Sequence, residues 1–275
     1  MLFLDRSMTA HEHSYAFDNA LAMQRERLDM LEALFDPGTT RHLDALEVAP
    51  GWRCLEVGAG GGSIAALLCD RVAPDGTVLA IDLDTRWVAE VSRPNLEVRV
   101  HDLLEAELPG GEFDLVHVRL VIGWLRDPQL GIERLIGALK PGGWLLAEEI
   151  DFITAVAHPR MDPEPRERFG RMVEAHNAVL AARHVFDPFY GRSVPADLEA
   201  AGLVDTGSEG RTAMWRGGGP GGRVWQLTIA QIRDEIVQGD LMSADDVDAA
   251  LAQCDDPSLV TVSPMIMAAW GRRPV

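Results

Sequence analysis

The chain has 275 residues, which is long enough for one domain with a large core and added segments. Its apolar content of 47% and charged content of 25% are ordinary for a globular protein. The formal net charge of −18 argues against nucleic acid or an anionic membrane as a partner, because both are negatively charged. No apolar run reaches eighteen residues and the N-terminus lacks the basic region of a signal peptide, so we expect a cytoplasmic protein.

The first predicted elements are helical. Apolar residues recur at helical spacing over residues 14–35, and a second helix over 39–46 leads toward the first strand. The segment 36–38 is expected to separate these helices, because its proline removes a backbone donor. His11 and His13 flank an acid as in a metal clip, but no second cluster accompanies them and the cysteines are widely spaced. We therefore predict no bound metal.

The next segment carries the strongest signal. An apolar run over 52–57 breaks into four glycines and continues as a helix-compatible segment over 64–71. Glycines at a strand-to-helix turn permit positive φ and let a ligand approach the main chain, and doubly wound folds bind nucleotide-like cofactors there. The pattern reads E-x-G-x-G-x-G from Glu56 to Gly62 and departs from the dinucleotide fingerprint at Ser63. An acidic residue beside the turn suits a cationic ligand.

Four further segments follow in order. A buried-type strand over 77–84 contains Asp82, near the spacing at which nucleotide folds place a ribose-binding carboxylate. A helix is expected over 85–92, and the alternative role for Asp84 is to cap this helix. The strand over 96–100 is followed by Asp102, and another strand covers 113–120. The turn Leu139-Lys140-Pro141-Gly142-Gly143 then precedes a fifth strand.

Together these segments, over about 51–151, resemble the Rossmann-like (class I) methyltransferases that use S-adenosylmethionine. The resemblance implies an α/β fold with a doubly wound, mostly parallel seven-stranded sheet, whose antiparallel last strand lies between strands five and six. It also implies that Asp82 binds the ribose, that Asp102 binds the adenine amino group and that Leu103 flanks the ring. The predicted cofactor-binding residues are Tyr15, Glu56, Gly58, Gly60, Gly62, Asp82, Leu83, Asp102, Leu103 and Arg119.

The rest of the chain is expected to complete one methyltransferase domain. Residues 1–46 would form an N-terminal helical cap, 47–157 the cofactor-binding core, 158–202 an inserted cap, and 203–275 strands six and seven with intervening helices. The elements predicted within the inserted cap are helices over 166–184 and 195–201. Those predicted after it are a strand over 204–215, a flexible glycine-rich connection over 217–222, helices over 224–237 and 244–254, and a strand over 260–270.

The acceptor is predicted to be a small aromatic or hydrophobic metabolite of the secondary-metabolite type. Its pocket would lie between the N-terminal segment and the insertion, with walls from Trp124, Phe186, Phe189 and Tyr190. The methylated atom is left open among nitrogen, oxygen and carbon. The candidates for a catalytic base are Glu149, Asp151, His176 and His184. Arg119 would pair with the cofactor or a substrate carboxylate, or else form an internal ion pair with Glu149 or Asp151.

Two other functions remain possible at this point. One is an NAD(P)-dependent oxidoreductase, against which Ser63 and the turn over 139–143 argue. The other is a non-catalytic relative that still binds the cofactor. The oligomeric state is open, with a homodimer as one possibility.

Overall fold

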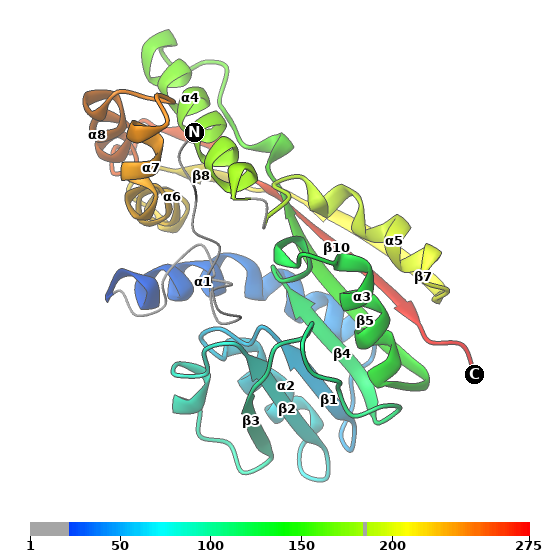
Figure 1. The fold of residues 1–275 in the computed structure, drawn as a ribbon. Coiled ribbons are helices and arrows are strands. Elements are labelled where there is room, and N and C mark those ends of the chain that lie inside the picture. Colours follow the sequence, from blue (N-terminus) through cyan, green and yellow to red (C-terminus); the bar gives the residue numbers. More distant parts are fainter. Residues whose placement is uncertain (1–21, 184–185) are drawn as a thin grey trace, which may run out of the picture.

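Seven strands form one sheet in the order β3-β2-β1-β4-β5-β10-β7 (Figure 1). The computed structural model describes residues 22–183 and 186–275. The strands are β1 (Arg53–Val57), β2 (Thr77–Asp82), β3 (Leu96–Val100), β4 (Phe113–Arg119), β5 (Leu139–Asp151), β7 (Val204–Arg211) and β10 (Met265–Arg272). Strands β1 to β5 pair in parallel, whereas β10 runs antiparallel to both β5 and β7. The predicted seven-stranded sheet and the place of its antiparallel strand are confirmed.

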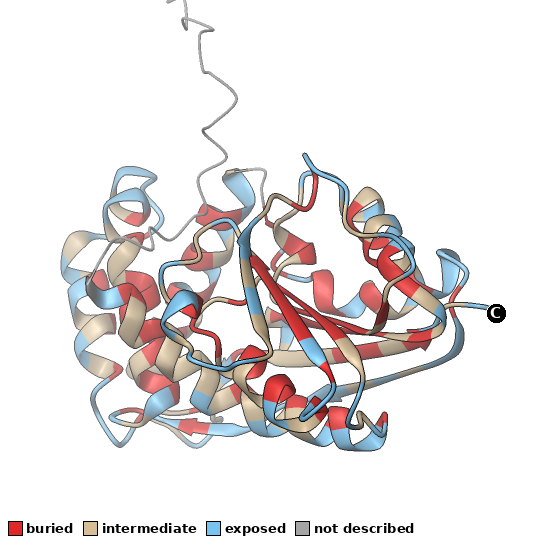
Figure 2. Cartoon of the chain, turned by 90° about the horizontal axis from the view of Figure 1, so that it is seen from below, coloured by how far each residue is buried: buried red, intermediate tan, exposed pale blue. Residues whose placement is uncertain are grey.

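Helices cover both faces of this sheet, which is why its central strands are apolar nearly throughout. On one face the C-terminal part of α1 (Ala22–Ala45) and α2 (Ser63–Val72) pack on residues such as Cys54 and Leu115. On the other face α3 (Pro128–Ala138) and α5 (Val194–Ala200) pack on residues such as Leu55 and Val116. Figure 2 shows the buried positions gathered on the central strands and on the inner sides of the helices.

A second core lies beyond the end of β5. It contains a three-stranded sheet and a group of helices, with aromatic residues among its buried side chains. The strands are β6 (Val156–Ala157), β8 (Met214–Arg216) and β9 (Val260–Val262). The helices are α4 (Pro163–Ala182), α6 (Pro220–Gln231), α7 (Arg233–Gln238) and α8 (Ala244–Gln253). Short 3₁₀ turns are η1 (Val88–Glu90), η2 (Ile122–Trp124), η3 (Phe152–Thr154) and η4 (Tyr190–Arg192).

Both strands predicted near the C-terminus are divided between the two sheets. The predicted strand over 260–270 breaks before Pro264, which has no N–H to give to a ladder, into β9 and β10. The predicted strand over 204–215 breaks at the same level into β7 and β8, where Ser263 N donates to Ala213 O at 2.8 Å. The antiparallel pair β7–β10 therefore bends and continues into the small sheet as β8–β9.

The predicted break in the first helix is wrong. Helix α1 runs through Pro37 without interruption. Tertiary contacts hold it on both sides of the proline, because Asp36 pairs with Arg119 at 2.8 Å and Thr39 donates to Glu148. These contacts outweigh the one backbone hydrogen bond that the proline removes.

Two further elements differ from the sequence prediction. The helix expected over 85–92 is reduced to η1, because the Asp84 carboxylate accepts from Arg86 N and holds a turn there. The glycines over 217–222 do not form a flexible connection. Gly221 and Gly222 lie inside α6 and are buried, and a Cβ on Gly221 would stand 2.3 Å from Trp215 Cγ. Within the described residues, no helix is long and apolar enough to cross a membrane.

Candidate functional site

The glycine turn follows β1 and is tied to the neighbouring strand. Gly58 N and Ala59 N both donate to Ile81 O, at 2.8 and 3.2 Å. Gly58 has a φ of +70°, and a Cβ there would lie 2.2 Å from Val121 Cγ2, just beyond the end of β4. Only glycine fits both the backbone conformation and this contact. The turn therefore presents bare main chain between the ends of β1 and β4.

Asp82 is the last residue of β2, and its carboxylate holds the glycine turn through hydrogen bonds. Gly60 N donates to its Oδ2 at 2.9 Å, and Asp84 N donates to its Oδ1 at 3.0 Å. Burial raises the pKa of Asp82, and these backbone donors oppose that shift. Because a carboxylate oxygen accepts more than one hydrogen bond, each oxygen keeps room for a ligand donor.

Helix α1 lies across the same turn. Leu28 Cδ2 is 3.5 Å from where a Cβ on Gly60 would stand, and Ser63 N donates to Glu32 Oε1 at 3.4 Å. Burial, helped by the nearby Asp36 charge, raises the pKa of Glu32. Sequence reasoning missed this acid, because a single glutamate on a helix has no spacing that relates it to a loop thirty residues away.

Three other predicted cofactor residues differ in their surroundings. Asp102 Oδ1 accepts from Leu104 N at 2.8 Å, which fixes the turn after β3. Leu103 is 5% exposed and packs in the core, so it does not offer its side chain to a ligand as expected. Leu83, which directly follows Asp82, is 54% exposed and remains accessible.

Glu56 belongs to a chain of alternating carboxylates and imidazoles under the site. Its Oε2 lies 2.6 Å from His117 Nδ1, and His117 Nε2 lies 3.2 Å from Glu148 Oε2. Glu148 Oε1 is 2.9 Å from His42 Nδ1, and His42 Nε2 is 2.9 Å from Glu209 Oε2. The first four of these side chains are buried. Glu56 therefore directs one oxygen, Oε2, to His117, and its contact with a cofactor stays a prediction.

The carboxylates and imidazoles of this series shift one another's pKa values. Burial alone would lower the pKa of His117, but the Glu56 and Glu148 carboxylates on either side outweigh it and raise that pKa to about 9. Burial would likewise raise the pKa of Glu148, yet hydrogen bonds from His117 and His42 hold it below its ordinary range. Burial would lower the pKa of His42, but hydrogen bonds with Glu148 and Glu209 raise it. His117 thus donates from each ring nitrogen as a cation near pH 7.

Arg119 takes part in the attachment of α1 to the sheet. Its guanidinium donates to Asp36 Oδ1 at 2.8 Å and to Thr39 Oγ1 at 2.9 Å. An internal ion pair was one of the sequence alternatives, but the partner is Asp36 rather than Glu149 or Asp151. Its role toward a cofactor stays a prediction.

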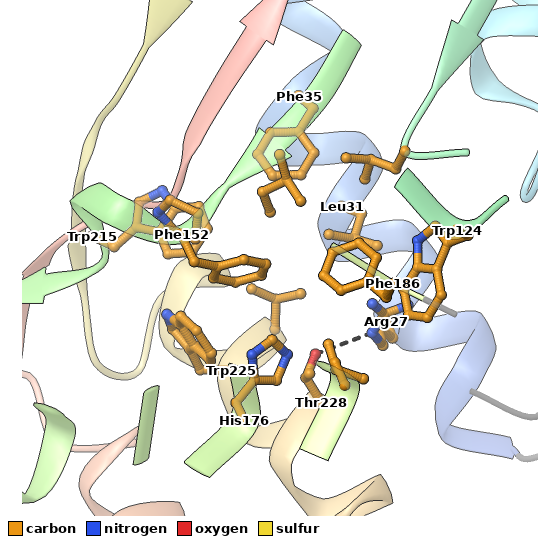
Figure 3. A pocket seen from close by; sticks show the side chains of 15 residues that line it. Arg27, Leu31, Phe35, Trp124, Phe152, His176, Phe186, Trp215, Trp225 and Thr228 are labelled. Atoms are coloured by element: carbon orange, nitrogen blue, oxygen red, sulfur yellow. Dashed lines mark hydrogen bonds between the residues drawn. The ribbon is translucent and has the colours of Figure 1, made fainter. Parts of the chain in front are cut away.

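A pocket lies next to the glycine turn, between α1, α4, α6 and the ends of β4 and β5 (Figure 3). Its space is about 600 Å³ when counted out to its opening to solvent. The lining residues are Arg27, Leu31, Phe35, Leu120, Trp124, Ile150, Phe152, His176, Leu180, Phe186, Trp215, Val224, Trp225, Thr228 and Pro264. Six of these are aromatic rings of phenylalanine or tryptophan, so the walls are largely flat and apolar.

Three polar side chains gather on one side of this pocket. Arg27 Nε donates to Thr228 Oγ1 at 3.1 Å, and His176 lies beside them, whereas Phe35 occupies the opposite side (Figure 3). Burial lowers the pKa of His176 to about 4, although a hydrogen bond with Asn177 opposes the shift. The imidazole is therefore neutral near pH 7, and Arg27 supplies the one charge among the lining residues.

The structure assigns the predicted pocket walls only in part. Trp124 and Phe186 line the pocket and stack with ring centroids 4.2 Å apart. Phe189 is 38% exposed beneath Arg192, and the hydroxyl of the buried Tyr190 donates to Asp197 at 2.7 Å. Neither of the latter two residues lines the pocket. The aromatic walls that sequence reasoning missed are Phe35, Phe152, Trp215 and Trp225.

The carboxylates proposed as bases are both engaged inside the protein. Glu149 accepts from Val121 N at 3.0 Å and Ile122 N at 2.7 Å, and burial raises its pKa to about 7. Asp151 forms a bidentate pair with Arg192 at 2.6 and 2.7 Å. Neither lines the pocket, whereas His176 does. Tyr15 and His184 lie outside the described residues.

Among residues 22–183 and 186–275, no group of three or more histidine, cysteine or acidic side chains is arranged to hold a metal ion. All three cysteines are buried, and burial raises the pKa of Cys69 to about 11.

Comparison with known proteins relates this site to a family. A family model described as a methyltransferase domain matches residues 15–206. The chain is 31% identical over 176 residues to methyltransferase str2 of Strobilurus tenacellus, covering 64% of this chain and 62% of that protein. It is 31% identical over 193 residues to nocamycin O-methyltransferase of Saccharothrix syringae, covering 62% of this chain and 66% of that protein. The chain thus spans 62% of the length of str2.

The fold is also similar to solved structures. Phosphoethanolamine N-methyltransferase 2 of Haemonchus contortus, in complex with S-adenosyl-L-methionine, matches with a TM-score of 0.55 and 16% identity. The match covers 94% of this chain and 61% of that one. At this identity the likeness concerns the fold, and it agrees with the sheet order described above.

Proposed function

This chain belongs to the methyltransferase-domain family of S-adenosylmethionine-dependent enzymes, and on that premise we propose that it methylates a small, flat, hydrophobic acceptor held in the aromatic pocket. The family is matched by 15–206, which includes the glycine turn, Asp82 and the end of β4. The acceptor, the methylated atom and the roles of individual residues are part of the proposal.

One observation carries it. The glycine turn and the aromatic pocket meet at two consecutive residues after β4. Val121 is in contact range of Gly58, and Leu120 lines the pocket. Leu120 directly follows β4 and has a φ of +58°, which turns the backbone away from the sheet. A cofactor on the turn and an acceptor in the pocket would therefore lie side by side, as direct group transfer requires.

The residues around the turn fit the proposed cofactor. Gly58, with its positive φ and no Cβ, lets the turn close tightly against Val121 at the end of β4. We assign the ribose hydroxyls to Asp82, the adenine amino group to Asp102 and the methionine amino group to Glu32, since carboxylates accept from such donors. Leu83 is exposed beside Asp82 and would cover one face of the adenosine.

S-adenosylmethionine, when bound, supplies a methyl group on a cationic sulfur. The carbon–sulfur bond breaks and sulfur keeps the electron pair, while the acceptor atom forms the new bond to carbon. The chain's own part is to align the two molecules and exclude water, for which the walls from Trp124, Phe152 and Trp225 are suited. The neutral imidazole of His176 would accept a hydrogen bond from the acceptor and orient it.

The relatives support this acceptor class. Nocamycin O-methyltransferase is named for transfer to oxygen of a natural product, so oxygen is the first atom to examine. A metabolite of secondary metabolism is consistent with that likeness and with a pocket lined by six aromatic rings.

The test combines binding and turnover. Calorimetry is expected to show binding of S-adenosylmethionine by the full chain, and a panel of phenols and hydroxylated polycyclic aromatics with labelled cofactor is expected to yield a methylated product. The variant Phe152→Ala should lose turnover and keep cofactor affinity, because Phe152 lines only the pocket. Binding of NADH without binding of S-adenosylmethionine would reject the proposal.

A further inference from the structure

The carboxylate of Glu149 holds the segment 120–124, which directly follows β4. This side chain lies near the end of β5 and is 1% exposed. Its Oε1 accepts from Val121 N at 3.0 Å and from Ile122 N at 2.7 Å, and its Oε2 accepts from Gly123 N at 3.4 Å. These donors are at the start of η2, and the first N–H groups of a helical turn find no partner within it. One carboxylate from the neighbouring strand therefore caps this turn.

The segment held in this way stands between the glycine turn and the aromatic pocket. Val121 Cγ2 lies 2.2 Å from where a Cβ on Gly58 would stand. Leu120 and Trp124 line the pocket. A displacement of the segment would therefore change the wall of the pocket and the contact with the glycine turn together.

From this arrangement we propose that Glu149 is a positioning residue for methyl transfer, which acts through the segment 120–124 and keeps it in its productive place only while the carboxylate is ionised. The inference rests on the proposed function, to which it adds a residue and a dependence on pH. Glu149 is not among the described residues that line the pocket, so its part is not to remove a proton from the acceptor. Its part is to fix the distance between the cofactor turn and the pocket wall, on which direct transfer depends.

Ionisation decides how well this side chain accepts hydrogen bonds. A carboxylate only accepts, whereas a protonated carboxyl carries an O–H that has nothing to offer a backbone N–H. Hydrogen bonds to the neutral group are also roughly half as strong. Burial raises the pKa of Glu149 to about 7, although its three backbone donors oppose the shift. The two forms therefore interconvert near neutral pH.

The surrounding groups leave this titration to Glu149 itself. The titratable or charged side chains that flank it on β4, on β5 and in the chain around η4 are Arg119, Glu148, Asp151, Asp187, Tyr190, Arg192 and Asp197. Asp151 pairs with Arg192, and the Tyr190 hydroxyl donates to Asp197 at 2.7 Å. Burial raises the pKa of Tyr190, so its hydroxyl is uncharged near pH 7. On β10 the residue opposite Glu149 is the apolar Met267.

Protonation of Glu149 does not by itself unfold the protein. Because its pKa is raised above the ordinary 4.5, the folded protein binds this proton more tightly than the unfolded chain. Its contribution to stability is full below pH 4.5 and is lost as pH rises through 7, so it grows between pH 8 and pH 6. A loss of turnover on going from pH 8 to pH 6 would therefore not be unfolding driven by this residue.

The first arm of the test follows the segment and needs no acceptor. Hydrogen exchange of peptides covering 120–124 is measured by mass spectrometry on the full chain at pH 8 and pH 6, as protection relative to the intrinsic rate at each pH. We expect wild-type protection to fall by roughly tenfold at pH 6, as the hydrogen bonds to the carboxylate weaken. Glu149→Gln should show the lower protection at both pH values, because an amide replaces one acceptor by a donor.

The second arm measures kcat with labelled S-adenosylmethionine and a member of the acceptor panel that is methylated. Wild-type kcat should fall by roughly 3- to 10-fold from pH 8 to pH 6, following the ionised fraction of Glu149. Glu149→Gln should have a low kcat that is flat over this interval. Asp127→Asn is the matched control, because Asp127 accepts from Leu130 N at the start of α3 and asparagine caps a helix equally well. It should keep the wild-type profile.

Several outcomes would overturn the proposal. They are equal protection of the wild type at the two pH values, wild-type protection in Glu149→Gln, a flat wild-type kcat, or a pH dependence of kcat that survives in Glu149→Gln. The wild-type measurements decide even where the variant fails to fold. Absence of product from the whole panel bears on the proposed function, whereas the exchange arm still decides whether Glu149 holds the segment.

Discussion

Asp82 holds the glycine turn in place and is also the residue expected to bind the ribose of the ligand. Both carboxylate oxygens accept from backbone N–H groups, at 2.9 and 3.0 Å, so the side chain is oriented before any ligand arrives. Orientation of this kind reduces the entropy lost on binding. The partial burial that raises the pKa of Asp82 also strengthens any hydrogen bond that it accepts.

The variant Asp82→Ala is therefore expected to weaken S-adenosylmethionine binding by about 1–3 kcal/mol, the size of hydrogen bonds to a charged group. Calorimetry on the folded variant measures the loss. Asp70→Ala is the control, because Asp70 pairs with Arg93 at 2.7 Å on the outer side of α2, and its removal should leave the affinity unchanged. An Asp82→Ala protein with wild-type affinity would exclude the ribose contact.

His176 is the one predicted base that lines the pocket, yet its surroundings point to orientation rather than proton removal. Its pKa of about 4 keeps the imidazole neutral from pH 5.5 to 8.5, and so weak a base holds a proton poorly. We predict that His176→Leu raises the KM for the acceptor, with a smaller effect on kcat. The pH profile of kcat should keep its shape over this range.

Steady-state kinetics over that pH interval check this, with His158→Leu as a histidine control outside the aromatic pocket. A wild-type kcat that rises with a pKa near 7 and loses this dependence in His176→Leu would instead identify His176 as the base.

At the scale of the elements, the strands were the most predictable part. β1, β2 and β4 are buried on both faces, so their sequences are short and mostly apolar, a pattern that indicates a parallel sheet. The turn glycines follow β1 directly, and their positive φ values could be anticipated from residue type alone.

Other elements depended on contacts distant in sequence. Nothing near Pro37 indicates that Arg119, more than eighty residues away, would hold the helix continuous through it. The pocket walls come from α1, η2, η3, α4, β8 and α6, which share no local pattern. Aromatic residues near Phe186 could be noticed, but their division between pocket, core and surface depends on the path of the chain after α4.

The glycines of α6 are a case in which close packing was mistaken for mobility. A Cβ on Gly221 would stand 2.3 Å from Trp215 Cγ, and Trp215 is a wall of the pocket. Gly221→Ala should therefore destabilise the protein by about 1–3 kcal/mol through overpacking. It should also weaken acceptor binding, since the tryptophan must move.

Gly170→Ala is the matched control in α4. No atom lies within 4 Å of the Cβ position there, so the change should be neutral or stabilising by up to about 1 kcal/mol. Urea unfolding of both variants compares the two effects. Equal stability of Gly221→Ala and wild type would mean that the connection yields, as the sequence prediction supposed.

At the scale of the whole molecule, the series of buried charges connects helix α1 to the strands of the main sheet. It runs from Glu209 on β7 through His42 on α1 and Glu148 on β5 to His117 on β4 and Glu56 on β1. Helix α1 covers the glycine turn and lines the pocket, so its attachment to the sheet through His42 and Thr39 positions both sites together. Removal of one partner from such a buried pair leaves the other charge uncompensated and is strongly destabilising.

The series of buried carboxylates and imidazoles makes the free energy of unfolding depend on pH, and this dependence has a definite direction. The pKa of His117 is about 9 in the folded protein and near its ordinary 6.5 when unfolded, so the folded state binds the proton more tightly. The resulting stabilisation is fully present below pH 6.5 and is lost as pH rises toward 9.

We predict that His117→Gln lowers the free energy of unfolding at pH 6 and that its deficit relative to wild type shrinks, on the order of 1–3 kcal/mol, between pH 6.5 and pH 9. The glutamine remains polar but cannot carry the charge that Glu56 and Glu148 stabilise from either side. Urea unfolding followed by circular dichroism at stepped pH measures both curves. His158→Gln, at a half-buried position away from these carboxylates, should run parallel to wild type throughout. Parallel curves for His117→Gln and wild type would mean that His117 is uncharged in the folded protein and that the buried carboxylates share a proton instead.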